Sequence, residues 1–245
     1  MMADAGVGPG LIARLKRAVG PRVTTKVRCL VRGYGLPRWG NLRRTRPFST
    51  QYGFERGTPI DRYYLHQFFE LHRHLITGRV LEVQTSAYTK LFGRDVTQAD
   101  TFDIVPEFDP TYVCDFAHCE GILTDEAYDC VLLPNTLPCF RELDRSLAQA
   151  FRIVRPGGAI LASTGGLLPL TRDVPEYWRL TPDGWRELLA SAWRGAELTV
   201  AEHGNCLAAV GAQMGLALEE LTDAELDVHD PRYPVLTTII CRKPC

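Results

Sequence analysis

Residues 79 to 93 contain the first side chains whose types and spacing could do chemistry. A short apolar run, Val80 to Val83, carries the acid Glu82 and leads into a turn of small polar residues. A strand that feeds such a turn directs backbone amides toward a ligand at the carboxyl edge of a parallel sheet. The turn is therefore predicted to hold a nucleotide-like cofactor, with Gln84 and Ser86 standing where glycine usually lets the backbone approach a ligand.

Two further acids are predicted to close the next two strands. A second strand over residues 95–99 ends at Asp100, which follows Glu82 by 18 residues and so has the spacing of a ribose ligand. A turn aspartate is an equal alternative for this residue, and Asp103 is an alternative ligand. A third short strand, residues 111–115, ends in the acid Asp115.

The remaining chain alternates between strand and helix patterns, which implies a parallel sheet with right-handed crossovers. We therefore predict an α/β fold with a doubly wound, mostly parallel seven-stranded sheet. The later strands are expected at 128–135, 159–164, 197–201 and 234–241, and the helices at 58–76, 143–154 and from Thr181 to about Ala192. The first of these helices has the start signal Thr58-Pro59-Ile60-Asp61, in which Thr58 can cap and Pro59 suits the first turn.

Size and composition indicate one globular domain, residues 54–245, after a basic extension, residues 1–53. No apolar run approaches the roughly 20 residues of a membrane span. The eight cysteines contain no C-x-x-C pair, which favours reduced thiols over a metal site or disulfides. With no apolar signal-peptide core near the start, the expected location is the cytoplasm, and no metal is expected.

Charge is unevenly distributed along the chain. Residues 1–50 hold 11 Lys or Arg and the single acid Asp4, while the remainder holds 17 bases and 28 acids. A basic arm could bind nucleic acid or an anionic lipid surface, or it could be a solvated extension that folds back on its own acidic domain. We favour the last, because few aromatic residues interleave with the bases, and expect neither nucleic acid nor membrane as partner. A short helix is predicted at residues 11–19, ended by Gly20-Pro21, and irregular chain from there to Thr50.

Taken together, these motifs resemble a class I S-adenosylmethionine-dependent methyltransferase, which has a Rossmann-like fold. The resemblance rests on Val80-Leu-Glu-Val83, the acids that close strands two and three, the segment that ends strand four, and Val154-Arg-Pro-Gly-Gly158. More narrowly, the chain is similar to a bacterial subgroup that is often found beside, or fused to, glycosyltransferases. The segments that carry this narrower likeness are 56–64, 177–182, 204–205, 219–222 and 225–234.

The resemblance implies an S-adenosylmethionine site at the carboxyl ends of the first four strands. The turn after the first strand would face the methionine half, and Asp100 would hold the ribose. Asp115 would accept from the adenine amino group, with Phe116 beside the ring. Arg56 and Arg62 would belong to an N-terminal helical lid. The cofactor-binding residues implied in this way are Tyr63, Glu82, Gln84, Ser86, Asp100, Asp115, Phe116, Asn135, Thr136 and Leu137.

Methyl transfer needs little from the protein beyond alignment and exclusion of water, but a hydroxyl acceptor usually also needs a base. His203 and His229 are the candidate catalytic bases, because each follows a predicted strand or helix and can titrate near neutrality. Asp230 could orient the ring of His229. The alternative is a structural hydrogen bond at each histidine.

The expected function is that of an O-methyltransferase that acts on a saccharide or a glycosylated small molecule in natural-product biosynthesis. Related proteins have glycine in place of Gln84, which motivates an alternative: a methyltransferase fold repurposed for a cyclisation or elimination. A third reading is a non-catalytic partner of a glycosyltransferase. The expected partner is a small-molecule acceptor, and the sequence is compatible with a homodimer.

Overall fold

The computed structural model divides the chain into two compact units, Met1–Thr45 and Arg46–Cys245. It describes residues 21–33, 38, 40–170 and 174–245. The first unit contains the helix α2 (Pro21–Val31) and the 3-10 turn η1 (Gly40–Leu42). The helix expected at residues 11–19 lies outside the described residues. The expectation of irregular chain after Pro21 is wrong, because this proline begins a helix, as its fixed φ and missing N–H permit in a first turn.

The second unit is built on one seven-stranded sheet with the order β3-β2-β1-β4-β5-β7-β6. The neighbours from β3 to β5 are parallel, whereas β7 runs antiparallel to both β5 and β6. This confirms the predicted fold class. The strands are β1 (Gly78–Val83), β2 (Val96–Asp103), β3 (Tyr112–Val113), β4 (Tyr128–Leu133), β5 (Val154–Gly165), β6 (Glu197–His203) and β7 (Leu236–Arg242).

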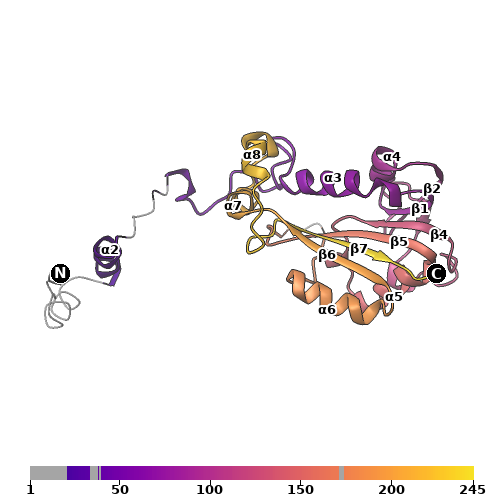
Figure 1. Ribbon diagram of the computed structural model, residues 1–245. Helices are drawn as coiled ribbons and strands as arrows, with labels where there is room; N and C mark the ends of the chain where they lie inside the picture. Colours follow the sequence, from indigo (N-terminus) through magenta and orange to yellow (C-terminus); the bar gives the residue numbers. More distant parts are fainter. Residues whose placement is uncertain (1–20, 34–37, 39, 171–173) are drawn as a thin grey trace. The chain divides into compact units, whose positions relative to one another are not determined.

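Helices cover both faces of the sheet (Figure 1). They are α3 (Asp61–Leu71), α4 (Ala87–Phe92), α5 (Leu143–Ile153), α6 (Pro182–Ala192), α7 (Cys206–Met214) and α8 (Asp223–Leu226), with the 3-10 turns η2 (Arg73–Leu75), η3 (Phe116–His118), η4 (Leu137–Cys139) and η5 (Leu218–Glu220). Within the part of the chain that the structure describes, no helix has both the length and the hydropathy to cross a bilayer.

Each face of the sheet has its own apolar core. The first core includes Leu147 of α5 and Trp185 of α6, and the second includes Phe69 of α3 and Ala208 of α7. The central strand β4, of sequence YDCVLL, is buried along almost its whole length, as expected for a strand covered on both faces. The alternation of strand and helix patterns therefore predicted the layers correctly.

The start of α3 differs from its prediction. The helix begins at Asp61, and its N-cap residue Ile60 makes no capping bond. Thr58 is occupied elsewhere, because its hydroxyl donates to the Glu219 carboxylate at 2.7 Å, and Pro59 pairs with Ala217 in an isolated β-bridge. A tertiary contact to the chain around η5 thus replaces the local cap.

Candidate functional site

A cavity of about 350 Å³ lies beyond the carboxyl ends of β1, β4 and β5. This is the edge of an open α/β sheet where ligands bind, and the volume is in the range of small-molecule pockets. Segment 52–62 and the chain after β5 supply the remaining walls. The lining residues are Tyr52, Phe54, Pro59, Asp61, Arg62, Gln84, Asn135, Pro138, Cys139, Gly165, Gly166, Leu168, Val174 and Glu176.

A chain of hydrogen bonds joins the sheet to α3 within this cavity. The Asn135 side-chain amide donates to Oδ2 of Asp61 at 2.9 Å, and the same oxygen accepts from Arg62 at 2.8 Å. On its other side, Oδ1 of Asn135 accepts from the Ser163 hydroxyl at 3.1 Å. These bonds fix an acid, a base and an amide at the wall of the cavity. Asn135 lines the cavity, and so does Asp61, which the sequence marked only within the start signal of the first helix.

The turn after β1 keeps the backbone of a glycine turn without a glycine. Gln84 has φ 66°, in the left-handed region, and its N–H donates to the Phe102 carbonyl at 2.7 Å. A non-glycine residue in this region costs on the order of 1 kcal/mol. The Gln84 side chain lines the cavity, while Ser86, the residue before α4, makes no side-chain capping bond.

Glu82, which was predicted to face the cofactor, does not line the cavity. Its carboxylate is buried and accepts from the backbone amides of Tyr88 and Thr89 at 3.0 and 2.8 Å, and from the Thr89 hydroxyl at 2.7 Å. Burial raises the pKa of this carboxyl group, against the lowering effect of the three hydrogen bonds. Glu82 therefore stabilises the start of α4, because it satisfies amides that a helix N-terminus leaves unpaired.

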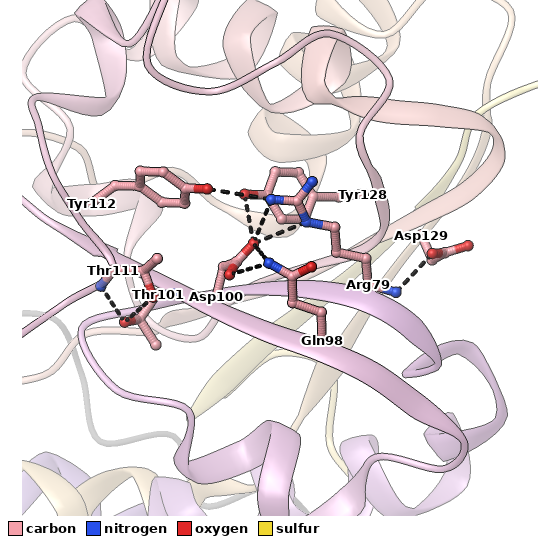
Figure 2. A network of polar contacts seen from close by, with 8 residues as sticks. All are labelled: Arg79, Gln98, Asp100, Thr101, Thr111, Tyr112, Tyr128 and Asp129. Atoms are coloured by element: carbon pink, nitrogen blue, oxygen red, sulfur yellow. Dashed lines mark hydrogen bonds and ion pairs between the residues drawn. The ribbon is translucent and has the colours of Figure 1, made fainter.

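Asp100 lies inside β2, so the prediction that the strand ends there is wrong. The strand continues to Asp103, because its pairing with β1 extends as far as Phe102. Asp100 accepts hydrogen bonds from Arg79 at 2.8 and 2.9 Å, from Gln98 at 2.8 Å and from Tyr128 at 3.1 Å. The dashed lines in Figure 2 mark these contacts. This carboxylate is buried and fully engaged by the protein. Its ribose-binding role has no support in the structure, and Asp103 occupies the strand end.

The acid after β3 and its neighbour also have structural partners. Asp115 caps η3 by accepting from the Ala117 amide at 3.0 Å. Phe116 is buried and stacked between Phe102 and Phe140, with ring centroids 4.4 and 5.3 Å apart. Phe116, which was predicted to lie beside a cofactor ring, is thus part of the first apolar core.

Other predicted cofactor contacts are divided between the core and the surface. Leu137 is completely buried, and the Thr136 hydroxyl donates to the Pro134 carbonyl at 3.0 Å, so neither lines the cavity. The Tyr63 hydroxyl donates to Asp227 at 2.7 Å and also lies outside the cavity lining. The lining of the cavity does not bear out these three predicted contacts.

Neither predicted catalytic histidine lines the cavity. His203 is the last residue of the edge strand β6, and its Nε2 lies 2.8 Å from the Thr238 hydroxyl. Burial lowers the pKa of His203. His229 is exposed, and the carboxylate that was expected to orient it, Asp230, pairs with Arg232 at 2.6 Å. The contact of His203 with Thr238 fits the structural alternative, a hydrogen bond.

Segment 52–62 covers the cavity and is held by η5. Arg56 pairs with Glu220, and the Thr58 amide donates to Glu219 at 2.9 Å. Arg62 lines the cavity, whereas Arg56 supports the segment from outside. No group of three or more metal-ligating side chains occurs among the described residues.

Part of the chain matches a known protein family, and the fold is similar to that of solved structures. Residues 68–162 match the methyltransferase domain family. An S-adenosylmethionine-dependent methyltransferase from Mesorhizobium loti is similar in structure, with 13% identity and a TM-score of 0.50 over 75% of this chain and all of that one. A chain from the complex between the Haloferax volcanii Trm112 methyltransferase activator and a methyltransferase is also similar, with 14% identity and a TM-score of 0.50 over 76% of this chain and 94% of that one. At these identities the two structures show the fold alone.

No curated protein sequence matches the chain. The domain match and the fold support a class I S-adenosylmethionine-dependent methyltransferase. The chain is accordingly an enzyme, and its cofactor is S-adenosylmethionine.

The residues of the cavity fit one end of this cofactor. An amino-acid group carries an ammonium and a carboxylate, which complement the Asp61 carboxylate and the Arg62 guanidinium. Gln84 and Asn135 add amide donors and acceptors at the same wall. The set therefore suits the methionine end of S-adenosylmethionine.

Proposed function

We propose that the protein is an O-methyltransferase that acts on a saccharide or a glycosylated small molecule in natural-product biosynthesis. The observation that carries the proposal is a cavity that combines three charged side chains with exposed apolar side chains nearby. Asp61, Arg62 and Glu176 line the cavity. The adjoining chain exposes apolar side chains, each at least half accessible to solvent: Phe54, Leu167, Leu170 and Tyr177. Such a site suits an acceptor with hydroxyl groups at one end and an apolar body at the other. The likeness to glycosyltransferase-associated proteins supports the same acceptor class.

When bound, S-adenosylmethionine supplies an electrophilic methyl group on its sulfonium. The role of the protein is to align an acceptor oxygen with that methyl group and to take up the hydroxyl proton. We assign the methionine end to Arg62, Gln84 and Asn135, with Asp61 at the ammonium. Asp103, the last residue of β2, and Asp115, which follows β3, are assigned to the adenosine half.

Glu176 is the carboxylate that we assign as proton acceptor in place of the two histidines. Arg179 donates to Glu176 at 2.9 and 3.2 Å, and both bonds fall on Oε2. Among the described residues, no hydrogen bond falls on Oε1, which is therefore available to an acceptor hydroxyl. Asp61, the other carboxylate in the lining, is already engaged by Asn135 and Arg62.

The test is methyl transfer from labelled S-adenosylmethionine to a panel of saccharides and glycosides. We expect Glu176→Gln to lower kcat by about 10²–10⁴-fold, the usual contribution of a general base, with cofactor affinity unchanged. Glu187→Gln, at an exposed glutamate on α6, is the matched control and should leave kcat unchanged. Calorimetry that detects no binding of S-adenosylmethionine or S-adenosylhomocysteine, alone or with acceptors present, would refute the proposal.

The second candidate is a repurposed fold that catalyses a cyclisation or elimination. It is favoured by Gln84, which lines the cavity and has a backbone conformation typical of glycine. The variant Gln84→Gly separates the two functions. A gain in cofactor affinity indicates that the glutamine obstructs the cofactor and supports the second candidate, whereas little change supports methyl transfer.

A further inference from the structure

The helix α2 in the first unit has an apolar face exposed to solvent. Val23, Val27, Leu30 and Val31 are between 48 and 82% exposed. Their spacing of four, three and one residues places them together on one side of an α-helix. Exposure of four such side chains to water is unfavourable. The helix has only 11 residues, and a helix of that length is marginally stable in water without a partner.

Basic side chains border this apolar face. Lys26 and Arg28 lie on its two sides at 100° per residue, and Arg32 follows the end of the helix; all three are exposed. No acid occurs in the sequence between Asp4 and Glu55, so no carboxylate from this stretch neutralises them. The partner of α2 must therefore accept apolar side chains and offer negative charge at the same surface.

We propose that α2 binds the surface of an anionic lipid bilayer. Its apolar face would enter the boundary between headgroups and acyl chains, while Lys26, Arg28 and Arg32 contact lipid phosphates, which is the arrangement of an interfacial helix. A nucleic acid would use the charges but not the apolar face, and α2 has no aromatic side chain on which a base could stack. The exposed apolar face is the observation that changes the expectation from sequence, which favoured no membrane partner.

The acidic second unit does not oppose this binding strongly. Residues 51–245 hold 17 bases and 28 acids. An anionic surface repels the excess of acids. Salt screens an exposed charge that lies more than the Debye length, about 8 Å at physiological salt, from the lipid, so bases in direct contact with lipid contribute most per charge. Binding through the bases is accordingly expected to weaken as the salt concentration rises.

The experiment is cosedimentation of the full chain with vesicles of phosphatidylcholine and phosphatidylglycerol, and with vesicles of phosphatidylcholine alone. We expect binding to the anionic vesicles. The triple variant Lys26→Gln/Arg28→Gln/Arg32→Gln should lower the partition coefficient on the order of 100-fold, from the contribution of about three bases near a charged surface. The matched control removes three exposed bases of the second unit, Arg94→Gln/Arg194→Gln/Arg242→Gln, and should bind like the parent.

A second variant and a second measurement test the apolar face. Val27→Ser/Leu30→Ser should also weaken binding, and hydrogen exchange should show that the amides of α2 become protected when anionic vesicles are added. The proposal is wrong if the full chain ignores anionic vesicles, if the control triple loses binding as strongly as the α2 triple, or if α2 stays unprotected. Tighter binding to an oligonucleotide duplex than to vesicles, lost in the α2 triple, would identify nucleic acid as the partner instead. Methyl transfer is not needed for any of these outcomes.

Discussion

Arg79→Met should destabilise the second unit by removing the partner of a buried carboxylate. The Arg79 guanidinium donates twice to Oδ2 of Asp100 and lies 4.7 Å from the centre of the Tyr128 ring (Figure 2). The Asp100 side chain is 5% exposed and that of Arg79 is 31% exposed. After the substitution, the carboxylate would remain buried, with only Gln98 and Tyr128 as donors.

The size of the effect follows from these contacts. Removal of one partner of a buried ion pair costs about 3–5 kcal/mol, because the other charge stays desolvated. Because Gln98 and Tyr128 still donate to the carboxylate, we expect Arg79→Met to lower the free energy of unfolding by the smallest value in this range, about 3 kcal/mol. For a protein of this size, that loss corresponds to a fall in Tm of about 6–12 °C.

Acid should partly rescue the variant. An unpaired buried carboxylate has a folded-state pKa above its unfolded value of about 3.9, so the folded state binds the proton more tightly. Stability then rises as the pH falls toward about 4, and the deficit relative to the parent should shrink.

The assay is urea denaturation at several pH values, followed by tryptophan fluorescence. Arg145→Met is the control, because Arg145 pairs with Glu120 at 3.3 Å with both side chains about half exposed, and such pairs contribute less than about 1 kcal/mol. In the double variant Arg79→Met/Asp100→Leu no charge stays buried, so the loss should be smaller than in the single variant. A loss below about 1 kcal/mol in the single variant, or a larger loss in the double variant, would refute the reasoning.

Two smaller predictions concern the edge strand and a helix cap. Burial lowers the pKa of His203, so the unfolded state binds the proton of this histidine more tightly than the folded state does. The free energy of unfolding should therefore fall as the pH drops through about 6.5. His203→Gln should reduce that fall, measured as the urea midpoint at pH values from about 7.5 to 5. Thr181 accepts from the Gly184 amide at the start of α6, and Thr181→Ala should cost about 1 kcal/mol in the same assay. If the urea midpoint of His203→Gln depends on pH as that of the parent does, the assignment of His203 is wrong. If Thr181→Ala has the urea midpoint of the parent, the assignment of Thr181 as a cap is wrong.

The fold was predictable because its signals are local and repeated. The apolar run of β4 and the spacing of apolar residues in α5 each identify an element without reference to the rest of the chain. Thr181-Pro182 also marked the start of α6 correctly. The start of α3 was predicted wrongly by the same type of signal, because Thr58 bonds to Glu219, which lies 161 residues away. A capping residue that has a distant partner cannot be recognised from its own neighbourhood.

The extent of β2 was missed for a related reason. Asp100 is a poor strand residue on propensity, and an acid at that point suggests a strand end. In the structure, Arg79 on the neighbouring strand β1 neutralises it within the sheet. The pair is formed by residues 21 positions apart, so only the register of β1 against β2 reveals it.

Glu82, inside β1, and Asp115, after β3, explain why site residues were harder to predict than the fold. In a doubly wound sheet, a helix starts soon after each parallel strand, and its unpaired amides compete with a ligand for any nearby carboxylate. Glu82 is taken by α4 in this way, whereas Asp115 gives one of its two oxygens, Oδ1, to η3. Asp61 and Glu176 instead enter the cavity from segments that only the fold brings to the strand ends. A carboxylate near a strand end is thus a good indicator of the fold, while its role in ligand binding depends on whether the next helix has already satisfied it.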